Sequence, residues 1–410
     1  MELHPILEKG EWLCKQNLWY VVSARGQHPS MRVGQCCCHI PSGGSGGIGK
    51  LAVIGGANPN GPFDETHLLE FDQYEWDEPE LTGFTARYEH ASFVAPSNPD
   101  KVLVFGGAQQ DKNLNCIQIL DLATKSWSMV PTSGTAPSPR TCRGSAFDGS
   151  KLYIFGGGQQ GSEPVPDTKM HVYDAVTGEW MQPPSSGRIP AARHGHVMAV
   201  CNGKVYLHGG MSGSTLFDDM YEYSVDTGVW KLVKTKGDVP PGRAAHGCVS
   251  HGNKILIFGG MTQEGGASDE SFIFDTRKSR WLKFKPDGPP PAPRLDHAMC
   301  LLTLPCPKQT SQPMSSRQNG AGAAAGSSSS APSVGDPSRA AEEFLTSCVD
   351  SVAEQMSAES PGEGTLGGGG AASSAVPGEA TLCCVVQGGM DTQGEIFDDC
   401  LILRLDNLLL

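Results

Sequence analysis

Short apolar runs recur along the chain, and each run is followed by a pair of glycines. Val102–Phe105, Leu152–Phe155 and Ile255–Phe258 are examples. The pairs are Gly55 and Gly56, Gly106 and Gly107, Gly156 and Gly157, Gly209 and Gly210, Gly259 and Gly260, and Gly388 and Gly389. Short apolar runs that stop at glycine are typical of buried β-strands. The steps between pairs are 51, 50, 53, 50 and 129 residues, which indicates a repeat with one late insertion.

Two other residue types recur with the same period. An arginine opens each unit, at Arg32, Arg87, Arg140, Arg193, Arg243 and Arg294, and a tryptophan closes one, at Trp19, Trp76, Trp127, Trp180, Trp230 and Trp281. The distance from a tryptophan to the next arginine is 13, 11, 13, 13, 13 and 13 residues. Three kinds of marker in near-constant phase over six units identify a true repeat.

Each unit is expected to form four short strands: an inner strand A that the arginine begins, a strand B before the glycine pair, a strand C, and an outer strand D that carries the tryptophan. Glycine allows backbone to pass closely where a side chain would not fit. Each tryptophan is expected to be structural and to bury about 200 Å² between neighbouring sheets. A period near 50 residues with four strands per unit is typical of kelch repeats, which form β-propellers.

The sequence therefore predicts an all-β, six-bladed kelch propeller. No tryptophan follows Gly388, so Trp19 is expected to supply the missing outer strand of the last blade and close the ring. The predicted segments are a leader (1–16), the outer strand of blade 6 (17–31), blades 1 to 5 (32–86, 87–139, 140–192, 193–242 and 243–293), blade 6 (294–302 and 381–410) and a disordered insertion (303–380). The insertion is rich in Ser, Gly, Ala and Pro, and residues 340–356 within it have helical spacing of apolar side chains.

Composition and charge limit the partners. The chain has a formal net charge of −13, so nucleic acid and anionic membrane surfaces are unfavourable direct partners and a basic or amphipathic protein fits better. The sequence shows no signal peptide and no run of about 20 apolar residues, and we expect a monomeric cytoplasmic protein. Most of the 14 cysteines lie in apolar segments, where they are expected to be reduced core residues.

No catalytic, metal or cofactor motif is evident in the sequence. A P-loop, a dinucleotide fingerprint and a nucleophile elbow are all missing, so the chain is not expected to be an enzyme or to hold a cofactor. Cys36, Cys37, Cys38 and His39 are consecutive, and a strand would point them to opposite faces. His90, His196, His246 and His297 follow the unit arginine by three residues and are expected to pack and form hydrogen bonds.

A candidate partner-binding face follows from the repeat. The six arginines are expected to surround one mouth of the channel, beside variable B–C loops that carry Phe63, Met211, Phe217, Met261 and Met390. Two interpretations of the arginines stay open: each pairs with a nearby carboxylate or carbonyl and fixes blade packing, or some of them receive an acidic loop of a partner.

Specific stretches carry a family resemblance. They are residues 55–60 (GGANPN), 87–93 (RYEHASF), 193–198 (RHGHVM), 294–299 (RLDHAM) and 394–400 (GEIFDDC). On these stretches the chain resembles the family of Rab-nine effector proteins with kelch motifs. The resemblance implies a non-catalytic scaffold that binds a GTP-loaded Rab GTPase, acts in transport from late endosomes to the trans-Golgi network, and associates peripherally with those membranes.

Two alternatives belong to other functional classes. A kelch substrate adaptor of a ubiquitin ligase is expected to carry BTB and BACK regions before the propeller, and 18 residues precede Trp19. A propeller enzyme would need a metal or radical site, and a fold alone implies no chemistry.

Overall fold

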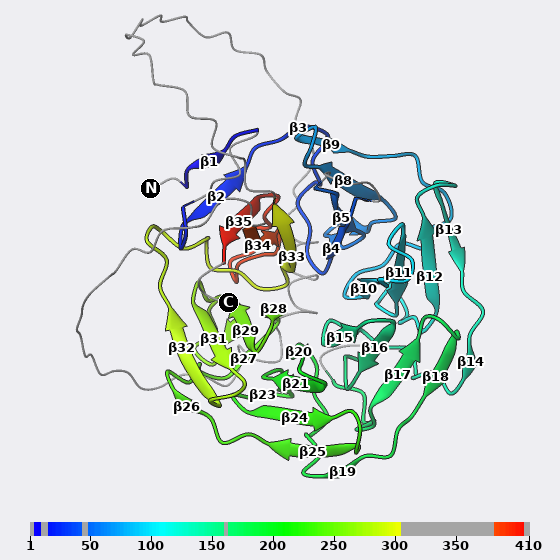
Figure 1. Cartoon of the computed structure of the whole chain (residues 1–410), viewed down its shortest axis with the longest axis vertical. Coiled ribbons are helices and arrows are strands. Elements are labelled where there is room, and N and C mark those ends of the chain that lie inside the picture. Colours follow the sequence, from blue (N-terminus) through cyan, green and yellow to red (C-terminus); the bar gives the residue numbers. More distant parts are fainter. Residues whose placement is uncertain (1–3, 10–14, 43–47, 160–162, 305–380, 406–410) are drawn as a thin grey trace, which may run out of the picture.

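Each regular element in the described part of the chain is a β-strand. The computed structural model describes residues 4–9, 15–42, 48–159, 163–304 and 381–405. Six sheets of four or five strands are arranged like blades around a central axis, and three further sheets have two strands each (Figure 1). The chain is therefore the six-bladed β-propeller that the repeat predicts.

Four consecutive antiparallel strands make the body of each blade, from the inner strand A to the outer strand D. Blade 1 contains β4 (Cys36–Ile40), β5 (Lys50–Ile54), β8 (Thr66–Glu70) and β9 (Glu75–Asp77). Blade 2 contains β10 (Ala91–Val94), β11 (Lys101–Phe105), β12 (Ile117–Asp121) and β13 (Ser126–Met129), and blade 3 contains β15 (Ser145–Asp148), β16 (Lys151–Ile154), β17 (His171–Asp174) and β18 (Glu179–Met181).

Blades 4 and 5 follow the same plan. Blade 4 contains β20 (Val197–Cys201), β21 (Lys204–His208), β24 (Met220–Ser224) and β25 (Val229–Leu232). Blade 5 contains β28 (Gly247–His251), β29 (Lys254–Phe258), β31 (Ser271–Asp275) and β32 (Arg280–Phe284). Hairpins in the B–C loops add β6 (Ala57–Asn58) with β7 (Gly61–Pro62) and β22 (Met211–Ser212) with β23 (Thr215–Leu216); β27 (Arg243–Ala244) pairs with β30 (Met261–Thr262).

Blade 6 is assembled from both ends of the chain. Strands β33 (Ala298–Leu304), β34 (Thr381–Gln387) and β35 (Cys400–Arg404) pair in sequence order, and β2 (Trp19–Val22) then pairs antiparallel with β35. Trp19 lies opposite Leu403 and Tyr20 lies opposite Ile402. Figure 1 shows β2 beside β35 at the point where the ring closes. The predicted closure by the N-terminal strand is confirmed.

Five of the six blades have a fifth, two-residue strand that the sequence analysis missed. This strand pairs parallel to strand D. In blades 1, 3, 4 and 5 it lies in the connection that precedes the blade. These strands are β3 (Arg25–Gly26), β14 (Ser133–Gly134), β19 (Ser186–Gly187) and β26 (Lys236–Gly237). The second residue of each is glycine for a steric reason. Gly134 has φ +76°, and a Cβ there would lie 2.0 Å from the carbonyl oxygen of Trp180.

The fifth strand of blade 6 corrects the prediction that residues 1–16 are only a leader. It is β1 (Ile6–Leu7), which pairs parallel with Val21 and Val22 of β2. Leu7 is 2% exposed and belongs to a core cluster between blades 6 and 1, so burial of an apolar side chain explains why this segment is ordered.

Each tryptophan packs against a neighbouring blade. The ring centroids of Trp180 and Phe105 are 4.8 Å apart, those of Trp230 and Phe155 5.1 Å, and those of Trp19 and Phe258 5.8 Å. In each pair, the tryptophan of one blade contacts a phenylalanine at the end of strand B in the preceding blade; Phe105 and Phe258 are the last residues of their strands, and Phe155 directly follows β16. Contacts between blades therefore form a continuous layer, and Trp19 takes part in it like the other tryptophans.

The insertion begins two residues later than predicted. Thr303 and Leu304 continue β33, because they pair with Leu382 and Thr381 of β34. The rest of the predicted disordered insertion, including the predicted helical stretch at 340–356, lies outside the described residues.

Candidate partner-binding face

The six repeat arginines make the same set of hydrogen bonds in every blade. Each Nη1 donates to the carbonyl oxygen of the first glycine of the pair at 2.9–3.0 Å, and each Nε donates to the carbonyl oxygen two residues earlier at 2.9–3.3 Å. The arginines are 0–1% exposed. Each one therefore ties the start of strand A to the end of strand B in its own blade.

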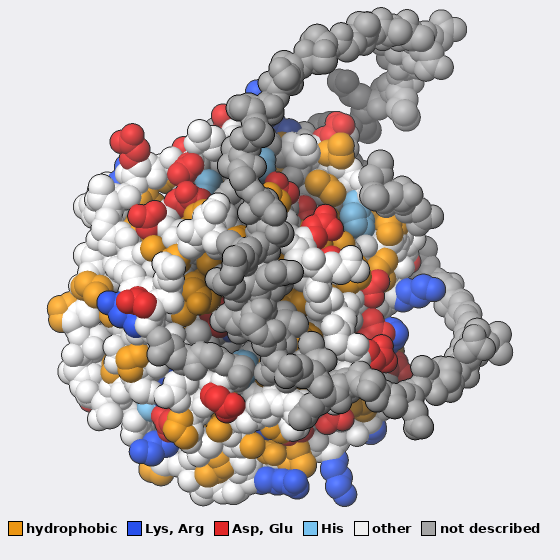
Figure 2. Space-filling model, turned by 180° about the vertical axis from the view of Figure 1, so that it is seen from behind, with side chains coloured by type: hydrophobic (Ala, Val, Ile, Leu, Met, Phe, Trp, Pro, Cys, Tyr) orange, Lys and Arg blue, Asp and Glu red, His pale blue; other side chains and the backbone are white. Residues whose placement is uncertain are grey.

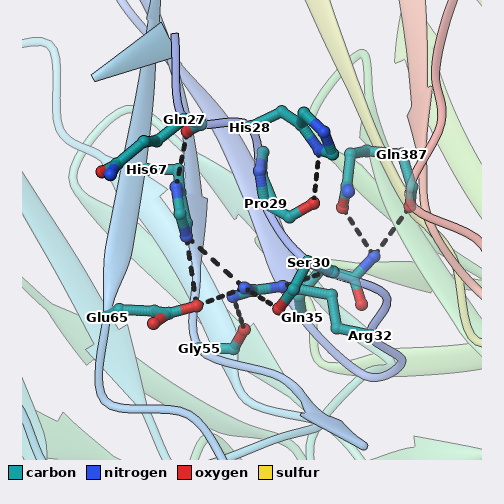
Figure 3. Close-up of polar contacts among 10 residues, drawn as sticks. All are labelled: Gln27, His28, Pro29, Ser30, Arg32, Gln35, Gly55, Glu65, His67 and Gln387. Atoms are coloured by element: carbon teal, nitrogen blue, oxygen red, sulfur yellow. Dashed lines mark hydrogen bonds and ion pairs between the residues drawn. The ribbon is translucent and has the colours of Figure 1, made fainter. Parts of the chain in front are cut away.

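The Arg32 cluster shows the arrangement in detail (Figure 3). Its Nη1 donates to Gly55 O at 3.0 Å, and its Nη2 donates to Ser30 Oγ at 3.0 Å and to Glu65 Oε1. His67 Nε2 lies 3.1 Å from the same carboxylate oxygen. Nearly every donor of this buried guanidinium therefore has an acceptor, which is the condition for burying such a charge without a large cost.

A carboxylate pairs with the arginine in five of the six blades. The pairs are Arg32 with Glu65, Arg140 with Asp167, Arg193 with Asp219, Arg243 with Glu270, and Arg294 with Asp399. The sequence analysis missed these acids, although each stands 10 or 11 residues after the first glycine of its pair. In blade 2 the corresponding residue is Cys116, and Arg87 Nη2 donates to Gln118 Oε1 at 2.5 Å.

The pKa values of the paired groups shift as expected for buried ion pairs. Burial lowers the pKa of Arg32, Arg140 and Arg243 from its ordinary value, and the carboxylates partly oppose this. Burial acts to raise the pKa of Glu65, but hydrogen bonds from Arg32 and His67 outweigh it and the pKa is lowered. The same balance lowers the pKa of Asp167 and Glu270. The carboxylates of Glu65, Asp167 and Glu270 are therefore charged at neutral pH.

The six arginines are buried, so they do not present an exposed positive surface. They precede strand A rather than begin it, and the structure favours the interpretation that they fix the packing within each blade. Phe63 and Phe217 are partly buried because they lie over guanidinium groups, 4.2 Å from Arg32 Cζ and 3.9 Å from Arg193 Cζ. A direct role of the arginines in partner binding stays a prediction.

The loop methionines are also less exposed than expected. Met211, Met261 and Met390 are 4%, 3% and 1% exposed, because they form an apolar cluster with Leu216, Ala244 and Leu295. The cluster joins the B–C loops of blades 4, 5 and 6. These methionines stabilise the loops, and their predicted contact with a partner stays untested.

The surface that the B–C loops do present is acidic. Apart from Lys112 and Lys169, every charged residue of loops 55–65, 106–116, 155–170, 209–219, 259–270 and 388–399 is an Asp or a Glu. Asp64, Glu163, Asp218, Glu264 and Asp398 are exposed. Figure 2 shows one face of the molecule, on which Lys and Arg side chains gather near the rim and Asp and Glu side chains also lie closer to the centre; the acidity of the B–C loops themselves follows from their sequences and exposure. Such loops favour a partner with a basic surface.

The residues with catalytic or metal-binding potential serve packing. His90, His196, His246 and His297 are 0–1% exposed and burial lowers their pKa values, to about 3 for His90 and His196, so they are neutral. Glu65, His67 and Glu78 bring three potential ligand atoms within 4.8 Å. A metal ion there would have to displace the Arg32 guanidinium, which already binds Glu65.

The arginine–glycine network, the packed tryptophans and the shared last blade define a kelch-repeat β-propeller. A model of the KLHDC2/KLHL20/DRC7 Kelch-repeats domain matches residues 44–260 and 218–304. The chain is 42% identical over 411 residues to the Rab9 effector protein with kelch motifs of Mus musculus, which covers 99% of this chain and 98% of the mouse protein. The Rattus norvegicus protein of the same name is 42% identical over 407 residues, 99% of this chain and 100% of its own.

A third relative covers less of the chain. The Rab9 effector protein with kelch motifs of Xenopus laevis is 47% identical over 212 residues, which is 52% of this chain and 58% of the frog protein. The chain belongs to the family of Rab9 effector proteins with kelch motifs. Within the described residues, no helix has the length and apolar character that a membrane crossing requires.

Proposed function

We propose that this chain is a non-catalytic effector that binds a Rab GTPase in its GTP-loaded state. The observation that carries the proposal is full-length similarity to proteins named as Rab9 effectors, together with a propeller whose polar network is used for packing. The resemblance to this family also implies action in transport between late endosomes and the trans-Golgi network, with peripheral association to their membranes.

The B–C loops are the proposed docking surface. Their acidic side chains stand on a rigid scaffold, and loops on a rigid scaffold commonly bind partners. An acidic rim attracts a partner with complementary charge and raises the rate of encounter. The proposed contact residues therefore include Asp218, Glu264 and Asp398, which are exposed.

The test is calorimetric titration of the protein with purified Rab9 loaded with a non-hydrolysable GTP analogue or with GDP. Tighter binding of the GTP-analogue form supports the effector function, and equal affinity for both forms contradicts it. A triple variant (Asp218→Lys, Glu264→Lys and Asp398→Lys) is expected to weaken binding by about tenfold or more.

The matched control is Asp226→Lys. Asp226 is an exposed acid in the C–D turn of blade 4, on the face opposite the B–C loops. Its reversal is expected to leave Rab binding unchanged. If the control weakens binding as much as the triple variant, the effect is one of overall charge and the proposed docking surface is wrong.

A further inference from the structure

The central channel contains a cavity that no part of the proposed function uses. Its volume is about 640 Å³, within the usual range of small-molecule sites. All six inner strands line it, namely β4, β10, β15, β20, β28 and β33. It extends from Glu89 and Arg143, near the B–C loop face, to Pro96, Phe147 and Leu301, near the A–B turns.

Backbone contacts between blades narrow the channel where the cavity ends. Around the axis, a backbone N–H of one blade donates to a backbone carbonyl oxygen of the preceding blade. These bonds run from Cys142 to Glu89 (2.9 Å), from Glu89 to Gly34 (2.6 Å), from Gly34 to Asp296 (3.0 Å), from Asp296 to Ala245 (3.0 Å) and from Ala245 to Gly195 (2.7 Å). Arg143 extends from blade 3 to blade 6, where its Nη2 donates to His297 O at 2.5 Å. This end of the cavity is the floor.

The floor holds two carboxylates and one guanidinium. Arg143 Nη1 lies 3.2 Å from Asp296 Oδ1, so Arg143 is engaged with blade 6. Glu89 borders the cavity and is hydrogen-bonded by the Thr141 hydroxyl. Among the described residues, no Lys, Arg or His nitrogen forms an ion pair with the Glu89 carboxylate within 4.0 Å. The Glu89 carboxylate is therefore acted on by the Arg143 charge from a distance but has no cation in direct contact.

The histidines and thiols around Glu89 are neutral near pH 7. Burial lowers the pKa of His90 to about 3 and lowers that of His246 and His297. Burial raises the pKa of the Cys36 thiol to about 11 and that of Cys248 to about 12. Burial, and then the Asp296 carboxylate, raise the pKa of Glu89 to about 7; burial also raises the pKa of Asp296. The Arg143 guanidinium and the Thr141 hydroxyl act to lower the pKa of Glu89 but do not outweigh burial and Asp296.

The walls above the floor are largely apolar. Met198, Met299, Val200, Leu301 and Phe147 are among the residues that line the cavity. Phe147 is 52% exposed, which is unusual for a phenylalanine in a strand next to a core. Flexible methionine side chains adapt to apolar ligands of different shape. The cavity thus combines an anionic floor with a hydrocarbon wall.

We propose that this cavity binds a small organic cation, with an ammonium group at Glu89 and a short hydrocarbon chain against Met198 and Met299. The ammonium supplies a cation in direct contact with Glu89, and its three N–H groups can donate to the carboxylate and to nearby carbonyl oxygens. The hydrocarbon chain buries apolar surface against the walls. This site is separate from the B–C loop surface, so it does not depend on the proposed Rab binding.

The test uses hexylammonium as the probe, with hexanol and hexanoate as neutral and anionic matches, and full-length protein with ¹³C-methyl-labelled methionine at pH 8. Hexylammonium is expected to shift the Met198 and Met299 methyl signals and to bind in the millimolar range, since the ligand is small. It is expected to bind at least about tenfold more tightly than hexanol or hexanoate. Equal binding of the three probes, or no shift at millimolar concentrations, overturns the proposal.

Three variants and a change of pH test whether the Glu89 carboxylate is the group that binds the ammonium of the probe. Glu89→Gln is expected to remove the preference for the cation, Glu89→Asp to retain it, and Glu163→Gln, an exposed acid on a B–C loop, to leave binding unchanged. Binding is expected to weaken as pH falls from 8 to 6, because Glu89 takes up a proton near pH 7 and the neutral histidines and thiols do not titrate there. Unchanged hexylammonium binding by Glu89→Gln contradicts the site.

Discussion

Blades 4 and 6 have the same architecture but differ in how the chain supplies their strands. In blade 4 all four main strands follow one another, whereas blade 6 takes β2 from the N-terminal region and the other three from the last third of the chain. Trp230 and Trp19 nevertheless pack against the preceding blade in the same way. The comparison teaches that inter-blade contacts, rather than continuity of the chain, decide the geometry of a blade.

The largest expected effect comes from removing the outer tryptophan of either blade. Trp19→Ala and Trp230→Ala are each expected to lower the free energy of unfolding by about 3 to 5 kcal/mol, because both side chains are 1% exposed and leave a cavity between blades. Urea titration of the two variants measures this. Chain termini ordinarily tolerate substitution. A loss of less than about 1 kcal/mol for Trp19→Ala, with the full loss for Trp230→Ala, would therefore show that Trp19 behaves like an ordinary terminal residue and would contradict the comparison.

The arginine pairs are expected to give the next largest effect. Arg294 binds both carboxylate oxygens of Asp399 at 2.6 and 2.8 Å, and Arg193 binds those of Asp219 at 2.5 and 3.2 Å. Asp399→Asn and Asp219→Asn each leave a buried guanidinium without its counter-charge, and each is expected to cost about 2 kcal/mol because the carboxylates are partly exposed. Urea titration should give the two variants equal losses within about 1 kcal/mol; very different losses would show that the blades are not equivalent.

The paired carboxylates of blades 1, 3 and 5 are expected to make the stability of the protein depend on pH. The folded-state pKa values of Glu65, Asp167 and Glu270 are lowered, so these pairs stabilise the protein fully above the unfolded pKa values near 4. Their contribution is lost as pH falls through the lower folded values. Thermal unfolding from pH 7 to pH 3 should show a falling melting temperature below about pH 4.5, and Glu65→Gln should flatten that dependence. An unchanged slope in this variant would contradict the assignment.

The smallest effect on stability is expected at the loop acids. Asp218→Lys in blade 4 and Asp398→Lys in blade 6 change exposed side chains and should alter the free energy of unfolding by less than about 0.5 kcal/mol. Both should weaken Rab binding, since they reverse charge on the proposed docking surface. If only one does so, the comparison of the two variants places the footprint of the Rab over that blade.

Residues at fixed spacing made the fold predictable. The glycine pairs, arginines and tryptophans recur because each blade repeats the same close contacts, and Trp19 could be assigned to the last blade because that unit had no tryptophan of its own. The two-residue strands such as β14 were missed, because a Ser-Gly pair carries no hydrophobic pattern. The sequence feature that could have revealed these strands is a glycine that pairs with the tryptophan of the following blade, as Gly134 pairs with Trp180.

The candidate face was less predictable than the fold. The sequence predicted the arginines at the mouth of the channel and the methionines on the B–C loops. Exposure depends on what packs over a residue, and Phe217 and Asp219 cover Arg193 in a way that no local pattern shows. Glu89 was hidden for a related reason. Its partners Arg143 and Asp296 belong to different blades and meet it only across the channel, so one unit gives no sign of the cluster.

Hydrogen exchange of the β2 amides tests the central claim, that the N-terminal strand seals the ring, most directly. The hydrogen bonds of β2 to β35, together with the bond from Val21 N–H to Pro5 O, are expected to protect the β2 amides as strongly as the amides of Val229–Leu232 in blade 4, so that both strands exchange only on global unfolding. Exchange of residues 19–22 at the rate of an unpaired chain terminus, with blade 4 still protected, would contradict the account.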